Sequence, residues 1–205
     1  MNVTIFIIAS FALLSIVEVF KRKLKISNDL ARRLAHIGAG LINIAAPFFV
    51  SHLAIIVVNV AFAGLLLASR NTDYFSSIQT TKRRTYGDVY FPLGIIAAAV
   101  ILLPQNVAAF QYGVAIMGVS DALAGLVGER WGKKTVSILG TPKTLAGALV
   151  FYVSSLVITL LFAPQLALAV LILPLILTAV EFMFVYGLDN LVLPVVSGLL
   201  FLTFF

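Results

Sequence analysis

The chain has 205 residues, of which 61% are hydrophobic and only 11% are charged, and its mean hydropathy is +1.11. This composition excludes a water-soluble globular domain, and the absence of cysteine excludes disulfides, thiol catalysis and cysteine-based metal sites. The net charge of +6 is better explained by basic loops beside membrane spans than by nucleic acid, so no nucleic-acid partner is expected.

Long apolar runs recur along the chain, each close to the roughly 20 residues with which a helix crosses a bilayer. In the first run the Lys/Arg cluster follows the apolar residues, so we interpret it as a retained span and not as a signal peptide. The pattern predicts an all-α bundle of about eight transmembrane helices, in a single integral membrane domain over residues 1–205. In chain order, the expected spans are Val3–Phe20, Leu34–Val50, Leu53–Ser69, Val89–Leu103, Val107–Val127, Thr144–Phe162, a seventh ending near Tyr186, and an eighth from Leu191 onward.

The charged residues predict how this topology is oriented in the membrane. With the N-terminus outside, all 14 lysines and arginines fall in loops 21–33, 70–88 and 128–143, which lie on one side of the membrane. The positive-inside rule makes that side cytoplasmic. The eight acidic residues lie in the cytoplasmic loops or in the adjoining ends of spans. The sequence therefore predicts a multi-pass protein of the cell membrane whose chemistry takes place at the cytoplasmic face.

One acidic residue, Asp121, lies two turns inside a predicted span. It shares a helical face with Ala124, Gly125 and Gly128, and Gly132 continues that face. Small residues let another helix or a ligand approach the backbone closely, so helix packing alone would explain the glycines. Packing does not explain an aspartate at this depth, because its short side chain reaches the interface poorly. We therefore favour a metal-binding or phosphate-binding role for Asp121.

A second motif covers residues 141–147. Thr141 and Pro142 are typical of the N-cap and the first position of a helix, which predicts that the next span begins here. With Lys143 and Thr144 in its first turn, the free N–H groups of this helix would form an anion site for nucleotide phosphates. An interfacial anchor is the simpler interpretation of Lys143 taken alone.

Further polar residues begin the second predicted span. Arg32, His36 and Asn43 follow one helical stripe, and Arg33 lies beside it. The two arginines alone indicate anchoring at the membrane surface, whereas the histidine one turn deeper indicates a functional role.

Polar residues also surround the fourth and eighth predicted spans. The segment from Lys82 to Gly94 contains Arg84, Tyr90 and Pro92, although aromatic residues at this depth are also typical of a membrane interface. Glu181 and the pair Asp189-Asn190 flank the last cytoplasmic turn, where a helix cap is the alternative role for the aspartate.

In these stretches the chain resembles the dolichol kinase, phytol kinase and CTP-dependent diacylglycerol kinase family of integral membrane lipid kinases. The resemblance extends from Arg32 to Pro194. The matching stretches are Arg32-Arg-Leu-Ala-His36, Tyr86-Gly-Asp-Val-Tyr-Phe-Pro-Leu-Gly94, Asp121-Ala-x-Ala-x-x-x-Gly-x-x-x-Gly132, Lys143-Thr-x-x-Gly147, and Glu181 followed by Asp189-Asn-Leu-x-x-Pro194. The chain departs from the family at Ser120 and Ala146, where the family often has Gly and Glu.

The resemblance implies transfer of a phosphoryl group from CTP to a membrane lipid alcohol, which would be a polyprenol, phytol, dolichol or diacylglycerol. The residues expected to act in catalysis are Asp121, His36 and Lys143. A divalent cation, Mg²⁺, would be bound by Asp121 with Glu181 and Asp189. The nucleotide and its phosphates would contact Arg32, Arg33, Arg84, Lys143, Thr144, Gly128, Gly132 and Gly147, and the site would be completed by Asn190, Tyr90 and Pro92.

Other functions stay open at this point. The nearest is a CDP-lipid synthase, which would attack the α-phosphate of CTP and release pyrophosphate. A membrane transporter would place its ionisable groups near the bilayer midplane, often between inverted repeats, whereas here they gather at one face. A purely structural membrane subunit leaves Asp121 unexplained. The sequence leaves the choice of alcohol and the oligomeric state open.

Overall fold

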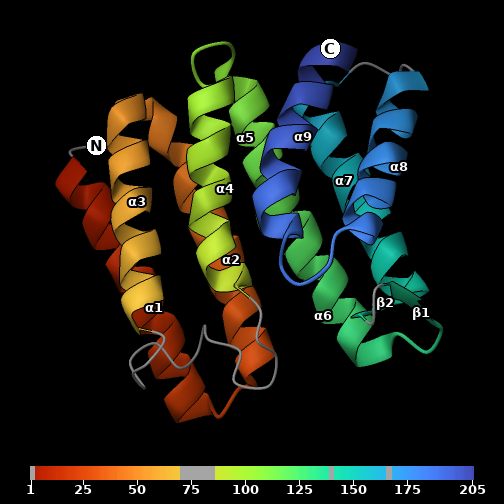
Figure 1. The fold of residues 1–205 in the computed structure, drawn as a ribbon, viewed down its shortest axis with the longest axis horizontal. Helices are drawn as coiled ribbons and strands as arrows, with labels where there is room; N and C mark the ends of the chain where they lie inside the picture. The colour runs from red at the N-terminus through yellow and green to blue at the C-terminus, as the bar shows by residue number, and fades with distance from the viewer. Residues whose placement is uncertain (1–2, 70–85, 139–140, 165–167) are drawn as a thin grey trace.

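The computed structural model describes residues 3–69, 86–138, 141–164 and 168–205, and within them the chain is helical apart from one hairpin (Figure 1). The predicted all-α class is therefore confirmed for these residues, with the hairpin of strands β1 (Thr135–Ile138) and β2 (Thr141–Thr144) as an addition. The helical elements are α1 (Val3–Leu24), α2 (Asn28–Ala45), the 3₁₀ turn η1 (Ala46–Phe48), α3 (His52–Ala68), α4 (Gly87–Leu102), α5 (Val107–Ala115), the π-helical turn η3 (Ile116–Asp121), α6 (Ala122–Trp131), α7 (Leu145–Phe162), α8 (Leu168–Met183) and α9 (Asp189–Phe204).

Local sequence explains several of these boundaries. The side-chain oxygens of Ser27, Ser51 and Asn106 accept hydrogen bonds from backbone N–H groups three residues on, and so cap α2, α3 and α5. The helix at the second predicted span, Leu34–Val50, covers Asn28–Ala45, so it begins and ends earlier than the apolar run suggested. A 3₁₀ turn follows it at Pro47, which has no backbone N–H to continue the α-helical pattern.

Among the described residues, three segments are long and apolar enough to cross a membrane. They are Val3–Leu24, Leu145–Phe162 and the continuous stretch Val107–Trp131 formed by α5, η3 and α6. Four shorter apolar helices, α3, α4, α8 and α9, accompany them. The number of spans and the external N-terminus stay predictions.

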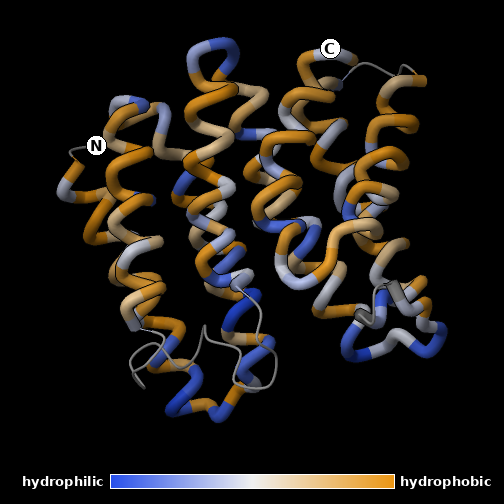
Figure 2. The backbone as a smooth tube through the Cα atoms, in the orientation of Figure 1, coloured by the Kyte–Doolittle hydropathy of each residue, from blue (hydrophilic) through white to orange (hydrophobic). Residues whose placement is uncertain are grey.

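The segments that carry every described lysine and arginine lie at one end of the bundle, which is the lower end in Figure 1. Figure 2 shows hydrophilic residues concentrated there, around the α1–α2 connection and the β-hairpin, with a smaller group at the α4–α5 turn opposite. This distribution agrees with the charge pattern that the sequence predicts for a single polar face.

The α5–η3 segment lies at the centre of the bundle. Tyr112, Phe110 and Met117 are fully buried in it, and α2, α7 and α9 pack around η3. A Cβ atom added at Gly118 would lie 3.1 Å from the Cα atom of Gly40, so two glycines allow α2 to approach η3 closely. This close packing places the start of α2 beside the residue that ends η3.

Candidate functional site

Asp121 is the last residue of the π-helical turn, inside the continuous segment from Val107 to Trp131. The helix α6 adds ten residues beyond it, so its Cα atom lies roughly 15 Å from the end of that segment. Its side chain is only 9% exposed. The sequence predicted an uninterrupted helix here and missed the π turn, a local widening that is frequent at functional sites.

Three carboxylates converge at this point. Glu181 from the last turn of α8, Asp189 from the first turn of α9, and Asp121 each place one oxygen within 4.8 Å of the others. We call these residues the carboxylate cluster. The α8–α9 turn ends higher in Figure 1 than α6 does. These are the three residues that the sequence analysis assigned to a metal, and the structure brings them together.

Lys143 reaches the carboxylate cluster from strand β2. Its Nζ atom donates a hydrogen bond of 2.9 Å to the backbone oxygen of Glu181 and forms an ion pair with the same residue's carboxylate. The Oδ2 atom of Asp189 lies 3.7 Å from it. Burial alone would lower the pKa of Lys143, but these two carboxylates outweigh burial and hold its pKa above the ordinary lysine value. The lysine is therefore charged at neutral pH.

The charges and donor atoms of this group fit a divalent cation. One ammonium group opposite three carboxylates leaves an excess of negative charge in a buried place. Like charges held this close are unfavourable unless a cation shares them or one carboxyl group takes up a proton. Carboxylate oxygens are also the ligands that Mg²⁺ prefers in proteins.

Arg33 lies beside the same cluster. Its Nη1 atom donates to the backbone oxygen of Asp121 at 3.4 Å, and its Nη2 atom donates to the carboxylate of Glu129 at 2.7 Å. The guanidinium lies directly over Gly125, where an added Cβ atom would be only 1.8 Å from its Cζ atom. The glycine on the face of Asp121 thus provides the space for an arginine. The sequence alone does not indicate this partner for the glycine.

The predicted helix start at Thr141 is wrong. Residues 141–144 form strand β2, and α7 begins at Leu145 with Thr144 as its N-cap. β-branched residues in both paired segments favour a strand, and Pro142 is tolerated because both strands of a two-stranded hairpin are edge strands. Lys143 therefore reaches the cluster from a strand, and the first-turn anion site expected around it is not formed in that way.

The glycines assigned to the nucleotide lie in packing contacts between α6 and α7. A Cβ atom added at Gly128 would lie 2.7 Å from the Oγ1 atom of Thr144, and one at Gly132 would lie 2.4 Å from its Cγ2 atom. The same Oγ1 atom accepts a hydrogen bond of 3.0 Å from the N–H of Gly147. These contacts explain the small residues by packing, and a direct nucleotide contact stays a prediction.

The two neighbouring arginines of α2 have different surroundings. Arg32 forms an ion pair of 3.6 Å with Asp29 on its own helix, whereas Arg33 contacts the cluster. Arg84 lies outside the described residues.

The α8–α9 turn contacts the start of α4 through a hydrogen bond and close packing. The Nδ2 atom of Asn190 donates to the backbone oxygen of Gly87 at 3.0 Å. The turn itself requires Gly187, which has φ +86° and packs against Gly87 and the ring of Tyr90. Asn190 therefore connects the carboxylate cluster to the start of α4.

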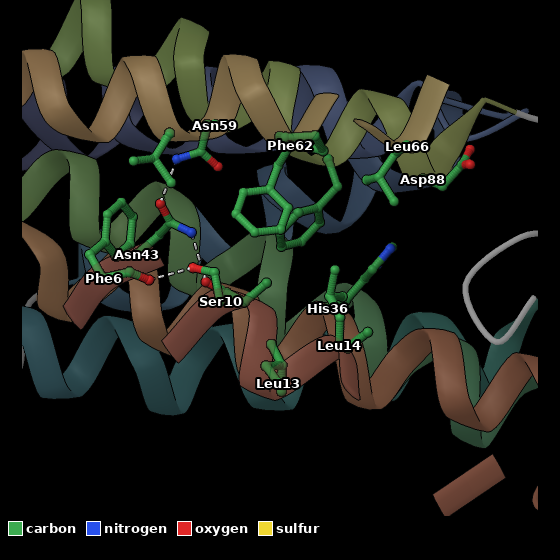
Figure 3. Close-up of a pocket in the computed structure, with 15 residues that line it drawn as sticks. Phe6, Ser10, Leu13, Leu14, His36, Asn43, Asn59, Phe62, Leu66 and Asp88 are labelled. Atoms are coloured by element: carbon green, nitrogen blue, oxygen red, sulfur yellow. Dashed lines mark hydrogen bonds between the residues drawn. The ribbon is translucent and has the colours of Figure 1, made fainter. Parts of the chain in front are cut away.

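A separate cavity of about 60 Å³ lies between α1, α2, α3 and α4 (Figure 3). His36 and Pro92 line it, and so does Asp88, which the sequence analysis did not assign to the site. The imidazole of His36 stacks on Phe91 with the ring centroids 4.5 Å apart. Its Nε2 atom is buried and has no hydrogen-bond partner within the described part of the chain.

The chain is similar to a curated protein, the phytol kinase of Synechocystis sp., with 27% identity over 186 residues. The resemblance to the polyprenol and phytol kinase family is confirmed. The aligned region covers 84% of this chain and 78% of that kinase, so the similarity extends over most of both proteins. No family model and no solved structure matches the chain.

Proposed function

We propose that the protein is a lipid alcohol kinase, which transfers the γ-phosphoryl group of CTP to the hydroxyl group of a membrane alcohol at the cytoplasmic face. The similarity to a phytol kinase supports the class of reaction. The observation that carries the proposal is the convergence of Asp121, Glu181 and Asp189 from three separate elements. Three carboxylates that are buried or half-buried in an apolar bundle are costly, and a bound cation with its phosphates would account for that cost.

The cation and the phosphates would be held by the cluster and its basic neighbours. Mg²⁺, when bound, would neutralise charge on the nucleotide phosphates, which phosphoryl transfer needs more than covalent chemistry. Asp121, Glu181 and Asp189 would hold it through their carboxylate oxygens. Lys143 and Arg33 are the described cations nearest to the cluster, and they would bind phosphate oxygens and stabilise charge on the transferred group.

The remaining requirement is an acceptor for the hydroxyl proton. In the proposed step, the alcohol oxygen bonds to the γ-phosphorus while the bond from that phosphorus to the β,γ-bridging oxygen breaks. CDP then leaves and the lipid phosphate forms. The proton passes to the Nε2 atom of His36, which accepts it when the neutral ring carries its own proton on Nδ1.

The decisive experiment follows the label of CTP. We would incubate the purified protein with Mg²⁺, phosphatidate, and phytol, polyprenol, dolichol or diacylglycerol, and with CTP labelled at either the γ- or the α-phosphate. Transfer of the γ label to lipid is the expected result. Transfer of the α label would instead identify a CDP-lipid synthase, and transfer of neither by folded protein would contradict both.

Two variants, with a third as control, test Asp121 as a metal ligand and His36 as the general base. Asp121→Asn should abolish turnover and the rise in Tm on adding Mg²⁺, whereas Asp29→Asn, half-exposed and paired with Arg32, should retain both. His36→Gln should lower kcat by about 10²- to 10⁴-fold, which is the usual contribution of a general base. A CDP-lipid synthase would tolerate His36→Gln, because a phosphatidate oxygen is already deprotonated near neutral pH. Wild-type turnover by Asp121→Asn would refute the metal site.

A further inference from the structure

We infer that the cavity between α1, α2, α3 and α4, here called the α1–α4 cavity, binds the hydrocarbon chain of the substrate and selects a single-chain alcohol over diacylglycerol. This inference rests on the proposed function and adds to it the class of alcohol and the place where it binds. It depends on the shape of the cavity, the polarity of its two ends, and its position relative to the carboxylate cluster.

The α1–α4 cavity is long and narrow. Its lining runs from Phe6 to Leu14 on α1, from Ala35 to Asn43 on α2, and from Val58 to Leu66 on α3. On each helix the two ends of the lining are eight residue steps apart, which spans about 12 Å. A volume of about 60 Å³ holds roughly four to six water-sized groups, so over this length the space admits one chain and not two side by side.

The two ends of the α1–α4 cavity differ in what they offer a hydroxyl group. Figure 3 shows His36 and Asp88 toward one end, and Asn43 and Asn59 toward the other, with Phe62 between them. The Nδ2 atom of Asn59 donates to the Oδ1 atom of Asn43 at 2.9 Å, so these amides already bond to each other. His36 is 6% exposed and its Nε2 atom is without a partner among the described residues. An alcohol hydroxyl therefore binds at the His36 end.

The backbone of α2 at that end packs against η3, whose last residue is Asp121. The backbone oxygen of His36 lies 3.4 Å from the position of a Cβ atom added at Gly118, three residues before Asp121. On the other side, Gly87 accepts the hydrogen bond from Asn190 and is followed directly by Asp88. A chain lying in the cavity with its hydroxyl at His36 thus points its reactive oxygen toward the site of the phosphates and its tail toward Asn43.

Photo-crosslinking tests this placement without requiring turnover. The probe is a single-chain isoprenoid alcohol that carries a diazirine in its chain, added to the protein in nanodiscs and mapped by peptide mass spectrometry. We expect saturable labelling within α1, α2 and α3. Unlabelled single-chain alcohol should compete for it, and diacylglycerol should not.

Substitutions at Leu14 fill or widen the cavity, and Ile16→Trp is the matched control. Leu14→Trp should weaken competition by the single-chain alcohol about tenfold, because its ring displaces roughly two methylene groups of the chain. Ile16→Trp lies on the same helix with its side chain 51% exposed, and should leave labelling unchanged. If Leu14→Trp does not fold, Leu14→Ala provides the opposite test, since the wider cavity should let diacylglycerol compete.

The outcomes separate this inference from the proposed reaction. Labelling that maps to other helices, that is equal in Leu14→Trp and wild type, or that diacylglycerol removes from the wild type overturns the cavity assignment. Labelling as expected, without transfer of either CTP label to lipid, supports the cavity as the alcohol site and refutes the kinase reaction.

Discussion

The substitution Gly125→Ala tests the proposed role of Arg33 without altering the arginine itself. A Cβ atom at residue 125 would lie 1.8–1.9 Å from three atoms of the guanidinium group. Heavy atoms essentially never approach a Cβ atom within 3.0 Å, so the guanidinium must move away. The move breaks its hydrogen bonds to the backbone oxygen of Asp121 and to the carboxylate of Glu129.

In Gly125→Ala the gains and losses in folding stability nearly cancel, whereas nothing offsets the expected loss of catalysis. The ion pair with Glu129 contributes about 1 kcal/mol or less, because the glutamate side chain is 47% exposed. The hydrogen bond to the backbone oxygen of Asp121 is long, at 3.4 Å, and contributes about 0.5 kcal/mol. Alanine is favoured over glycine within a helix by about 1 kcal/mol, which offsets most of these two losses. A hydrogen bond to a charged group contributes about 1.5–3 kcal/mol, so withdrawing Arg33 from the transferred phosphoryl group should lower kcat about 10- to 150-fold.

The assay compares kcat and Tm for Gly125→Ala and Gly64→Ala. Gly64 is the matched control, because a Cβ atom added there meets nothing within 4 Å. Both variants should unfold within a few degrees of the wild type, and only Gly125→Ala should lose turnover. Wild-type kcat in Gly125→Ala would refute the role of Arg33. A large fall in its Tm would refute the stability argument instead.

Three other substitutions test the contacts around the site. In Gly113→Ala, the new Cβ atom lies 2.0 Å from the backbone oxygen of Pro194, which cannot rotate away, so we expect a loss of about 1–3 kcal/mol and a clearly lower Tm. A Tm equal to the wild type would show that α5 and α9 can separate. Lys143→Met leaves the carboxylate cluster without its buried counter-charge and should lower stability by about 3–5 kcal/mol, and Mg²⁺ should raise Tm more in this variant than in the wild type. Equal responses to Mg²⁺ would count against cation binding by the cluster. Asn190→Ala removes the hydrogen bond to Gly87 and should cost about 1 kcal/mol in thermal unfolding, while an unchanged Tm would make this bond dispensable.

The helices could be predicted from the sequence because their signals are local. The start at Val107 and the end at Phe162 agree with the structure, since a cap at Asn106 and the length of an apolar run depend on neighbouring residues alone. The strand at residues 141–144 could not be predicted in this way. Thr-Pro-Lys-Thr is typical of a helix start, and only pairing with Thr135–Ile138 makes it a strand.

The two adjacent arginines of α2 show a choice that the sequence alone cannot make. Arg32 and Arg33 are adjacent and chemically identical, but one step of about 100° around a helix separates their directions. The first therefore meets Asp29 and the second lies over Gly125. The sequence could name both as candidates, but only the packing of α2 against α6 decides which one contacts the cluster.

The proposed arrangement would let one site serve two substrates of opposite character. A hydrocarbon chain must stay in an apolar environment, and the α1–α4 cavity provides one within the bundle. A nucleotide carries several charges and must approach from the end where the basic segments and the β-hairpin lie. The two approaches meet where His36 adjoins the end of η3. An acid nearly three turns inside a helical segment is costly in lipid. In the proposed reaction it would be useful there, because the lipid hydroxyl would stay within the membrane and the phosphates would have to reach it.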